Sequence, residues 1–540
     1  MLLHLQDHTD TGSVQDVPGE ERLSRAIWLH AGLPAPHLCD GLGRCGRCRV
    51  RLEPEAGEPL PPPLDMERQV LGADTNAGWR LACRNTVAGV QGFTVHVPGT
   101  GAQSGPEPGD IPPSPGVTGA LRLAVDLGTT TVHWRFLNQH VRAFLPGQSL
   151  NPQCGAGSDV MSRLQAAASP EGRERLGGMV HDLLRSVIRN AEDRMPGASV
   201  EEVCLAANTA MTAIFLNLDV TPLSTAPYRL PLRGGHAVEL PDLPPVWIPP
   251  QPAPFIGGDV AAGMARALSE QTPFPFLFAD MGTNGECVLA LDADHALLAS
   301  VPLGPALEGI GLACGGVAGP GSVTEFTLGP GGLAASVPGG ETPRSICGTG
   351  ALSLLDVLLR AGVLTPDGLL AEPDYPLART IRASIRQQPH GWHLPLPGGL
   401  FFSADDVESV LKVRAAFSVA LRCLLEQASL PPQALSTLLL AGSLGQHTPA
   451  DLLVRLGFIP PELGGKARIV GNASLDGASL LAGSPEWRAR IIAWAEGCTV
   501  VDVSARPDFM QLFAASMRFA RGEPIDAVVI RNRSQSFANG

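Results

Sequence analysis

The sequence of 540 residues lacks a dense tract of lysine and arginine, and it has no uninterrupted apolar run of about 18 residues. At a net charge of −13, a chain without a basic tract repels the phosphate backbone of nucleic acids. The N-terminus, from Met1 to His8, has neither the basic start nor the apolar run of a secretory signal. We therefore expect a cytoplasmic protein that binds neither nucleic acid nor membrane.

Cysteine is also sparse, because 11 cysteines in 540 residues are too few for a disulfide scaffold. Cys39, Cys45 and Cys48 nevertheless lie in one glycine-rich loop, and Cys83 follows at a distance. Three thiolates from one loop and a fourth from a remote position are typical of a [2Fe–2S] ferredoxin, whose glycines let backbone N–H groups approach the sulfides. A zinc knuckle or a dithiol pair at Cys45-x-x-Cys48 is the alternative, but it leaves Cys39, Cys83 and the glycines unexplained.

The composition predicts four successive parts. Residues 1–98 are rich in turns and form a ferredoxin-type unit, and residues 99–119 are rich in Gly, Pro and Ser and form a flexible linker. Residues 120–506 alternate strands with amphipathic helices, which indicates an α/β domain, and residues 507–540 form a C-terminal extension. Helices are expected at Arg173–Arg194, Ala351–Ala361 and Ala404–Ala428, the last of them capped by Ser403.

Two copies of one motif suggest that the α/β domain has two related halves, at about 120–265 and 266–506. In each copy an apolar strand ends in an aspartate, Asp126 or Asp280, and a turn of small and hydroxyl residues follows. Backbone N–H groups and hydroxyls in such turns bind phosphate oxygens, and the aspartate can hold Mg²⁺ through water. One copy alone could be an ordinary hairpin, but two copies favour an ATP site closed from both sides of a cleft. The turn residues are Gly128, Thr129, Thr130 and Thr131 in the first copy and Gly282, Thr283, Asn284 and Gly285 in the second.

Two further segments fit the same site. Gly442 and Ser443 follow a buried strand in a glycine-rich turn that suits an adenosine lying on bare backbone. The segment Gly348-Thr349-Gly350 opens a helix whose N-terminus favours an anion, although a simple helix cap is the commoner role of such a segment. The chain has no GxxxxGK[ST] motif, so a P-loop fold is not the explanation. The four segments together are typical of the actin-like (ASKHA, ribonuclease H-like) ATPases, which have two lobes.

With both parts considered, the chain resembles the reductive activators of corrinoid proteins, which are ferredoxin–ATPase fusions that return Co(II) corrinoid to Co(I) in methyltransfer systems. The resemblance runs nearly end to end and rests on an ordered set of segments. They are CDGLGRCGRC with LACR, LAVDLGTTTV, Asn151–Leu164, Ala206–Asp219, Ala226–Pro231, Ile256–Gly263, ADMGTNGE, Gly304–Gly309, ICGTGALSLLD, DDVESVLKVRAA, LAGSLG and Gly471–Leu481.

The resemblance implies an N-terminal β-grasp [2Fe–2S] domain, a linker and a C-terminal actin-like ATPase, with ATP and Mg²⁺ as further cofactors. It implies a corrinoid protein or cobalamin-dependent methyltransferase as partner, an upstream electron donor, and in some members a homodimer. Because Leu121 follows the linker directly, we expect the middle domain of some members to be missing, which weakens the expectation of a dimer. The family's Gln-x-x-Lys pattern is also replaced, by Leu411 and Arg414, and the chain end lacks cysteine-rich motifs.

The mechanism that we expect is uphill electron transfer driven by ATP. A plant-type [2Fe–2S] centre has a potential of about −400 mV, the Co(II)/Co(I) couple is lower, and each ~59 mV of deficit costs about 1.4 kcal/mol. ATP bound between Asp126 and Asp280 would change domain closure, and Glu308 or Asp259 would position the attacking water, unless these two acids only cap turns. The alternatives are a small-molecule kinase with an attached ferredoxin module and a nucleotide-gated electron carrier that does not hydrolyse ATP.

Overall fold

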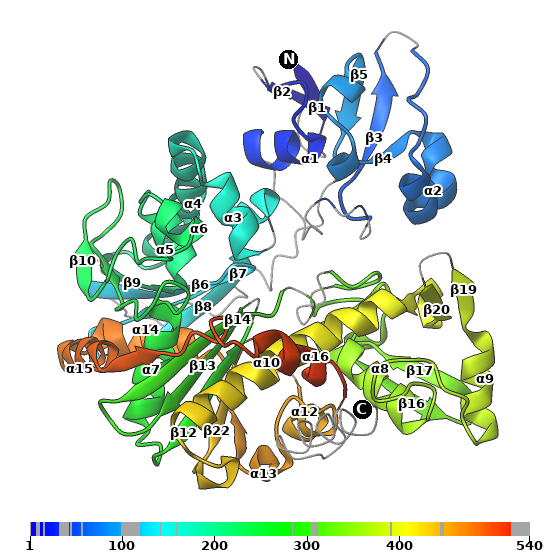
Figure 1. Ribbon diagram of the computed structural model, residues 1–540. Helices are drawn as coiled ribbons and strands as arrows, with labels where there is room; N and C mark the ends of the chain where they lie inside the picture. Colours follow the sequence, from blue (N-terminus) through cyan, green and yellow to red (C-terminus); the bar gives the residue numbers. More distant parts are fainter. Residues whose placement is uncertain are drawn as a thin grey trace. The chain divides into compact units, whose positions relative to one another are not determined.

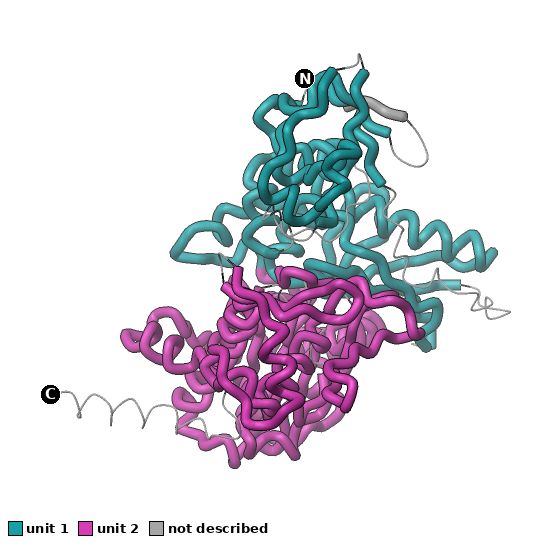
Figure 2. Tube along the Cα trace, turned by 90° about the vertical axis from the view of Figure 1, so that its right-hand side faces the viewer, with its two compact units in different colours: residues 1–232, 237–247 teal, residues 233–236, 248–540 magenta. Residues whose placement is uncertain are grey.

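The computed structural model describes residues 2–6, 11–14, 17–31, 41, 43, 46–55, 58–98, 119–140, 142–157, 159–282, 284–304, 306, 311–316, 318–388, 391–442 and 448–519 (Figure 1). The chain divides into two compact units, shown in Figure 2. Unit 1 comprises residues 1–232 and 237–247, and unit 2 comprises residues 233–236 and 248–540. The predicted linker lies outside the described residues, except for Gly119. Among the helices in the described ranges, none has both the length and the apolar character needed to cross a bilayer.

The N-terminal part of unit 1 is a five-stranded sheet in the order β2-β1-β5-β3-β4. β1 pairs with β5 in parallel, and the other neighbours are antiparallel. Burial alternates along β1, β3 and β5, so that Leu5, Val50, Leu52 and Val95 share one face and pack in a core with Trp28. The elements are β1 (Leu3–Gln6), β2 (Thr11–Val14), α1 (Leu23–Arg25), the π-helix η1 (Ala26–His30), β3 (Arg49–Pro54), α2 (Asp65–Leu71), η2 (Gly72–Ala77), β4 (Trp79–Leu81), η3 (Ala82–Arg84), η4 (Ala88–Val90) and β5 (Phe93–His96).

A second, six-stranded sheet has the order β10-β11-β9-β6-β7-β8. Its central strand β6 is buried along most of its length, as expected of a strand that is covered on both faces. The elements in chain order are β6 (Gly119–Leu127), β7 (Thr131–Leu137), β8 (Ala143–Leu150), η5 (Pro152–Ala156), α3 (Val160–Ala166), α4 (Pro170–Arg194), β9 (Ala198–Ala207), α5 (Thr209–Phe215), α6 (Thr221–Ser224), β10 (His236–Val238) and β11 (Val246–Ile248).

Unit 2 contains another six-stranded sheet, in the order β23-β22-β12-β13-β14-β24, and smaller sheets beside it. Its elements are α7 (Gly258–Ser269), β12 (Phe276–Met281), β13 (Asn284–Ala290), β14 (Ala296–Pro302), β15 (Ser322–Val323), β16 (Glu325–Gly329), β17 (Gly332–Ser336), η7 (Pro338–Gly340), β18 (Ser345–Ile346), α8 (Gly348–Arg360), α9 (Pro376–Ser384), β19 (Arg386–Gln388), β20 (Gly391–Pro395), η8 (Pro397–Gly399), β21 (Phe401–Ser403), α10 (Ala404–Gln427), η9 (Pro432–Ala434), β22 (Leu438–Ala441), α12 (Ala450–Arg455), α13 (Pro461–Gly464), β23 (Ala467–Ile469), α14 (Ala473–Gly483), α15 (Pro485–Glu496), β24 (Cys498–Val500) and α16 (Phe509–Ser516).

Five strands of each six-stranded sheet repeat one topology. In the first, β6, β7 and β8 are successively antiparallel, while β9 joins β6 in parallel and β11 joins β9 in parallel. In the second, β12, β13 and β14 are antiparallel, while β22 joins β12 in parallel and β23 joins β22 in parallel. The hairpins β6–β7 and β12–β13 therefore occupy equivalent positions, and these hairpins carry the two copies of the repeated motif.

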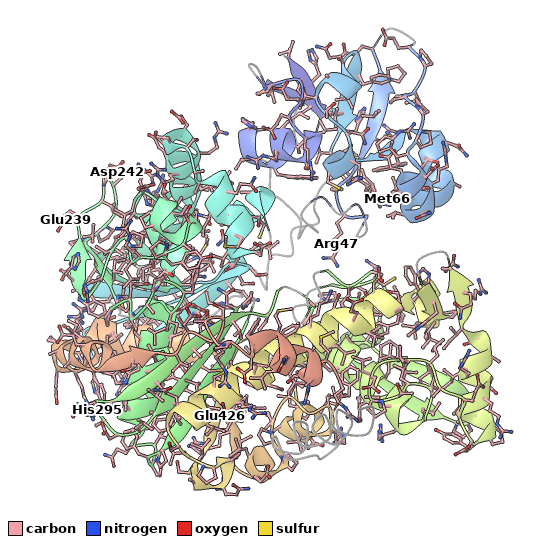
Figure 3. The ribbon with its side chains drawn as sticks, in the orientation of Figure 1. Arg47, Met66, Glu239, Asp242, His295 and Glu426 are labelled. Carbon is pink, nitrogen blue, oxygen red and sulfur yellow. The ribbon has the colours of Figure 1, made fainter. Side chains whose placement is uncertain are left out.

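Helix α10 crosses unit 2 and packs against β13 and β14. It begins after Ser403, whose hydroxyl accepts the N–H of Asp406, so the predicted cap is confirmed. Arg414 is buried and donates to the carbonyl oxygens of Gly457, at 2.9 Å, and Ser516, at 2.5 Å. On the same helix Glu426, labelled in Figure 3, accepts an N–H from Arg506 at 2.6 Å. Near its start, the predicted C-terminal extension contains a helix, α16, which packs on α10.

Candidate functional sites

The first phosphate turn, residues 128–131 or turn 1, joins β6 to β7. Asp126 stands near the end of β6 opposite His133, whose Nδ1 lies 3.6 Å from Asp126 Oδ2. The N–H of Gly128 donates to the carbonyl oxygen of Thr131 at 3.1 Å and closes the turn. A Cβ atom at Gly128 would stand 2.7 Å from that oxygen, so the turn requires glycine here.

A buried polar network holds turn 1, and the sequence did not assign these residues a role. The side-chain amide of Asn151 donates to the carbonyl oxygen of Gly128 at 2.8 Å, and its backbone N–H donates to Thr130 O at 2.9 Å. Arg163, which is fully buried, donates to Thr129 O at 2.9 Å. Both residues lie within Asn151–Leu164, one of the segments on which the family resemblance rests. That resemblance was the sequence signal that could have identified them.

Arg163 also links turn 1 to the short helix η5. Its guanidinium donates to Gln153 Oε1 at 3.0 Å and to the carbonyl oxygen of Gly157 at 2.6 Å. From the start of α5, Asn208 Nδ2 lies 3.2 Å from the hydroxyl oxygen of Thr129. Because these groups are buried and hydrogen-bonded, the conformation of turn 1 is determined by residues from three other elements.

The second phosphate turn, residues 282–285 or turn 2, joins β12 to β13 in unit 2. The N–H of Gly282 donates to the carbonyl oxygen of Asn284 at 3.1 Å. Asp280 stands before this turn, and Gly442 follows β22 on the neighbouring strand. A Cβ atom at Gly442 would stand 2.3 Å from Asp280 Oδ1, so glycine at this position lets the aspartate lie against bare backbone. Asp280 and Gly442, which the sequence assigned to one site, therefore lie side by side.

Glu286 is a further acid at turn 2 that the sequence reasoning missed. It pairs with Asp280 across the β12–β13 hairpin, and its side chain is buried. Burial, followed by the nearby carboxylates of Asp259 and Asp280, raises the pKa of Glu286 well above its usual value. Asp259, one of the two acids expected to position water, is in the first turn of α7. The charges of Asp259 and Asp280 thus both act on Glu286. Hairpin pairing was the signal that could have added Glu286.

The segment Gly348-Thr349-Gly350 forms the first turn of α8, as its composition suggested. A Cβ atom at Gly350 would stand 2.2 Å from the carbonyl oxygen of Val323, so close packing against β15 requires glycine there. The hydroxyl oxygen of Thr349 lies 3.3 Å from that of Thr448. Five predicted residues cannot be placed, because they lie outside the described residues: Cys39, Cys45, Thr283, Glu308 and Ser443.

Two of the four predicted cluster cysteines are adjacent in the N-terminal sheet. Cys48 immediately precedes β3 and Cys83 lies in η3, directly after the strand β4 that pairs with β3. The N–H of Ala82 donates to the carbonyl oxygen of Cys48 at 2.8 Å, which brings both cysteines to one end of the antiparallel β3–β4 pair. Both thiols are buried. Cys39 and Cys45 lie outside the described residues, and within the ranges that are described no three His, Cys, Asp or Glu side chains form a metal-binding group.

Three glycines that lie among these cysteines in the sequence have positive φ angles. Gly41, Gly43 and Gly46 have φ values of 81°, 74° and 67°, which other residues rarely adopt. A Cβ atom at Gly43 would stand 2.3 Å from Sδ of Met66, a residue of α2 that is labelled in Figure 3. The glycines that the sequence singled out are therefore required by the conformation of this loop.

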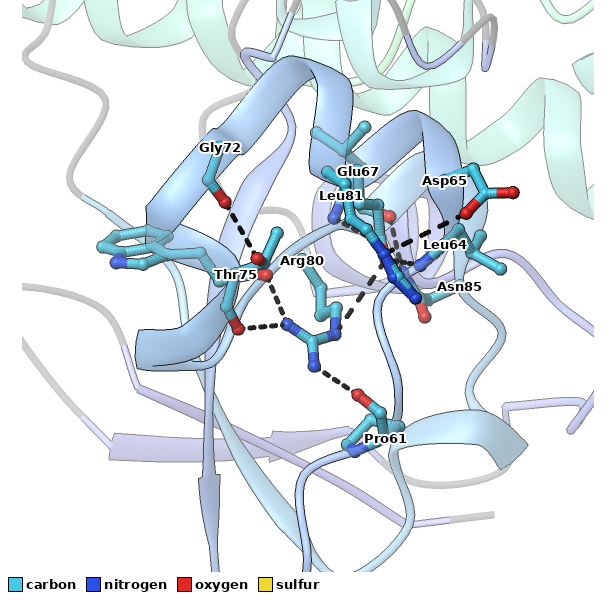
Figure 4. Close-up of polar contacts among 11 residues, drawn as sticks. Pro61, Leu64, Asp65, Glu67, Gly72, Thr75, Arg80, Leu81 and Asn85 are labelled. Atoms are coloured by element: carbon cyan, nitrogen blue, oxygen red, sulfur yellow. Dashed lines mark hydrogen bonds and ion pairs between the residues drawn. The ribbon is translucent and has the colours of Figure 1, made fainter.

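A buried ion pair fixes the segment that carries Cys83 (Figure 4). Glu67, on α2, accepts the backbone N–H of Leu81 at 2.7 Å and the side-chain amide of Asn85 at 2.8 Å. Its partner Arg80 donates to the carbonyl oxygen of Thr75 at 2.8 Å, and both charged side chains are buried. These bonds hold both ends of the short stretch around Cys83.

Comparison with known protein families identifies two parts of the chain. Residues 121–270 match the model described as the RACo middle region, and residues 275–527 match the model described as the C-terminal domain of RACo, the ASKHA domain. The expectation that the middle domain is missing is therefore wrong. It failed because residues 121–270, which carry turn 1, had been assigned to the first half of the ATPase domain.

Two curated proteins and a solved structure are also similar to this chain. The chain is 24% identical over 425 residues to the corrinoid activation enzyme RamQ of Eubacterium limosum, which covers 74% of this chain and 70% of that protein. It is 24% identical over 387 residues to the [Co(II) methylated amine-specific corrinoid protein] reductase of Methanosarcina barkeri, covering 65% of this chain and 68% of that protein. A solved structure of a reductive activator for corrinoid, iron-sulfur protein shares the fold, with a TM-score of 0.66 and 21% identity over 96% of this chain and 99% of the other. The chain thus carries the RACo middle region and the RACo C-terminal ASKHA domain, and it is homologous to corrinoid activation enzymes.

Proposed function

We propose that this protein is an ATP-dependent reductive activator of a corrinoid protein, which delivers one electron to Co(II) and regenerates Co(I). The observation that carries the proposal is the presence on one chain of neighbouring Cys48 and Cys83 and of two aspartate-led turns, turn 1 in the RACo middle region and turn 2 in the ASKHA domain. The printed names of both curated relatives, an activation enzyme and a reductase of corrinoid proteins, support it. The partner is accordingly a corrinoid protein or a cobalamin-dependent methyltransferase.

In this proposal the N-terminal part is a β-grasp ferredoxin domain with Cys39, Cys45, Cys48 and Cys83 as ligands of a [2Fe–2S] cluster. The sheet order, with β1 and β5 parallel at its centre, and the positive φ values of the loop glycines support this assignment. When bound, such a cluster supplies a one-electron centre of low potential. The residues of the chain hold the thiolates in place and, through Glu67 and Arg80, fix the backbone beside Cys83.

In this proposal the nucleotide-binding groups come from turn 1, in the middle region, and from turn 2, in the ASKHA domain. Backbone N–H groups of turn 1 and turn 2 bind phosphate oxygens, and the carboxylates of Asp126 and Asp280 suit Mg²⁺, which prefers oxygen ligands and water. Asp259, in the first turn of α7, contributes to the raised pKa of Glu286, and in this proposal it orients a water near turn 2. In this proposal nucleotide binding acts on the partner by favouring one conformational state of the chain, since a ligand shifts an equilibrium only by its differential affinity for the two states.

A direct assay separates this function from a kinase or a passive carrier. Reduced protein, MgATP and a Co(II) corrinoid protein are mixed anaerobically, and Co(I) is followed by its visible absorption. The proposal predicts Co(I) formation that requires ATP hydrolysis and the corrinoid protein together. ADP release that depends on a sugar or a carboxylic acid, with no Co(I), would favour the kinase. Equal Co(I) formation with a non-hydrolysable analogue would favour the passive carrier.

A further inference from the structure

The N-terminal part of unit 1 contacts the short helix η5, which belongs to the middle region. Trp28 of η1 packs so closely on Gly155 of η5 that a Cβ atom at Gly155 would stand 2.6 Å from Trp28 Cβ and 3.2 Å from the Trp28 carbonyl oxygen. Cys154 belongs to the same buried apolar cluster as Trp28 and the sheet residues around it. The contact is thus close-packed and dry, and a single methyl group is enough to disturb it.

A polar contact flanks this apolar one. Arg175, on α4, donates from its guanidinium to Nδ1 of His30 at 3.0 Å. The bond requires His30 to be unprotonated at that nitrogen, because an arginine cannot accept. Burial, and next the charges of Arg175 and Arg25, lower the pKa of His30, while Glu21 raises it, and the net lowering agrees with a neutral ring. Two independent contacts therefore join the N-terminal part to the middle region.

The opposite side of η5 holds turn 1. Asn151, which caps η5, binds the carbonyl oxygens of Gly128 and Thr130 at 2.8 and 2.9 Å. The thiol of Cys154 lies 3.7 Å from Thr130 O. Trp28 and the backbone of turn 1 are therefore separated only by the five residues of η5, which packs against Trp28 and is hydrogen-bonded to turn 1. A displacement of η5 changes both contacts at once.

We propose that η5 couples docking of the N-terminal part to phosphate binding at turn 1, so that each strengthens the other. This inference rests on the proposed nucleotide-binding role of turn 1. Docking keeps Asn151 in position to order the turn, and a phosphate bound to the ordered turn in turn keeps η5 in the position that receives Trp28. By thermodynamic linkage, the factor by which docking tightens nucleotide binding equals the factor by which nucleotide tightens docking. The nucleotide state of the chain thereby governs whether its electron-carrying part is held or released.

The test uses the full chain and three variants. Gly155→Ala inserts the methyl group that Trp28 excludes, and Arg175→Ala removes the bond to His30 without touching a buried residue. Gly178→Ala is the matched control, because a Cβ atom there meets nothing within 4 Å. Hydrogen exchange of peptides covering residues 26–30 reports docking, and calorimetric titration with the non-hydrolysable analogue AMPPNP reports nucleotide affinity.

The proposal predicts that AMPPNP slows exchange of residues 26–30 in the unaltered chain. It predicts that Gly155→Ala speeds this exchange and weakens AMPPNP binding, by about tenfold in each case, as expected of a typical allosteric coupling. Arg175→Ala should shift both quantities in the same direction by less, and Gly178→Ala should shift neither. Faster exchange with unchanged AMPPNP affinity in Gly155→Ala would overturn the coupling alone. An unaltered chain that binds no AMPPNP would instead refute the proposed nucleotide site itself.

Discussion

Gly442 lies directly against the carboxylate of Asp280, since a Cβ atom at Gly442 would stand 2.3 Å from Asp280 Oδ1 and 2.8 Å from the backbone nitrogen of Met281. The φ of Gly442 is 80°, a value that an L-residue with a side chain rarely adopts. The end of β22 thus fixes where the strand-end aspartate of β12 can stand. A change at Gly442 therefore acts on Asp280 without altering its charge.

Gly442→Ala should lower kcat for ATP hydrolysis by about 100-fold, because a displacement of a positioned group by about 1 Å has effects of that size. Steady-state ADP release measures this change. Gly465→Ala is the control, since a Cβ atom there meets nothing within 4 Å. Equal kcat values for the two variants would mean that the position of Asp280 is unimportant.

The stability of Glu286→Gln relative to the unaltered chain should increase as the pH rises. Because burial and the carboxylates of Asp259 and Asp280 raise the pKa of Glu286, the folded state binds this proton more tightly than the unfolded state. The contribution of Glu286 to stability is therefore present below its unfolded pKa of about 4.3 and is lost as the pH rises through the folded value. Melting curves at pH 5 and pH 8 should show Tm of the variant rising relative to the unaltered chain. Glu341→Gln, at an exposed glutamate, is the control. A Tm difference between Glu286→Gln and the unaltered chain that is independent of pH would contradict the raised pKa of Glu286.

Arg163→Met should destabilise unit 1 and loosen turn 1. Removal of the guanidinium leaves the oxygens of Thr129, Gln153 and Gly157 without this donor, and each buried acceptor left unpaired costs about 1–3 kcal/mol. Arg163→Lys should not restore stability, because one ammonium group cannot reproduce the planar fork. Thermal unfolding and AMPPNP affinity measure the effect.

The exposed arginine Arg189, on α4, supplies the control for this change. Arg189→Met should leave both thermal stability and AMPPNP affinity close to those of the unaltered chain, since surface substitutions usually change stability by at most about 0.5 kcal/mol. A fully stable Arg163→Met variant with normal affinity would show that turn 1 does not depend on the buried network.

Cys48→Ser and Cys83→Ser should each abolish or strongly alter the visible absorption of the anaerobically prepared protein, because each removes one proposed thiolate ligand. Cys498→Ser is the control, since Cys498 begins β24, far along the chain, and its thiol donates to the carbonyl oxygen of Trp494 in α15. Iron content and the visible spectrum are the measurements. Colourless, iron-free or zinc-loaded protein before any substitution would exclude the cluster.

Local sequence patterns predicted the elements whose signals are local. The Ser403 cap and the apolar period of α10 lie within one stretch of chain, and the strands before Asp126 and Asp280 are continuous apolar runs that end in the same motif. The equivalent positions of the two hairpins follow from that repetition. These features depend on propensity and pattern, which single sequences record well.

The residues that were missed depend on contacts between distant parts of the chain. Arg163 lies on a short helix, where an arginine usually faces solvent, and its burial results from the packing of η5 and turn 1 around it. Burial, followed by the carboxylates of Asp259 and Asp280, raises the pKa of Glu286, and these surroundings exist only in the folded chain. The middle region was misassigned for a similar reason, because the motif around Asp126 was attributed to the ATPase domain alone.

A single-turnover experiment tests the central claim most directly. The protein is reduced, freed of excess reductant and mixed anaerobically with a Co(II) corrinoid protein, with and without MgATP, while Co(I) and the oxidation of the cluster are followed by visible absorption. The account predicts one Co(I) for each cluster oxidised when MgATP is present, and none in its absence or in Gly442→Ala on the same timescale. Co(I) formation that ignores nucleotide, or cluster oxidation without Co(I), would contradict it.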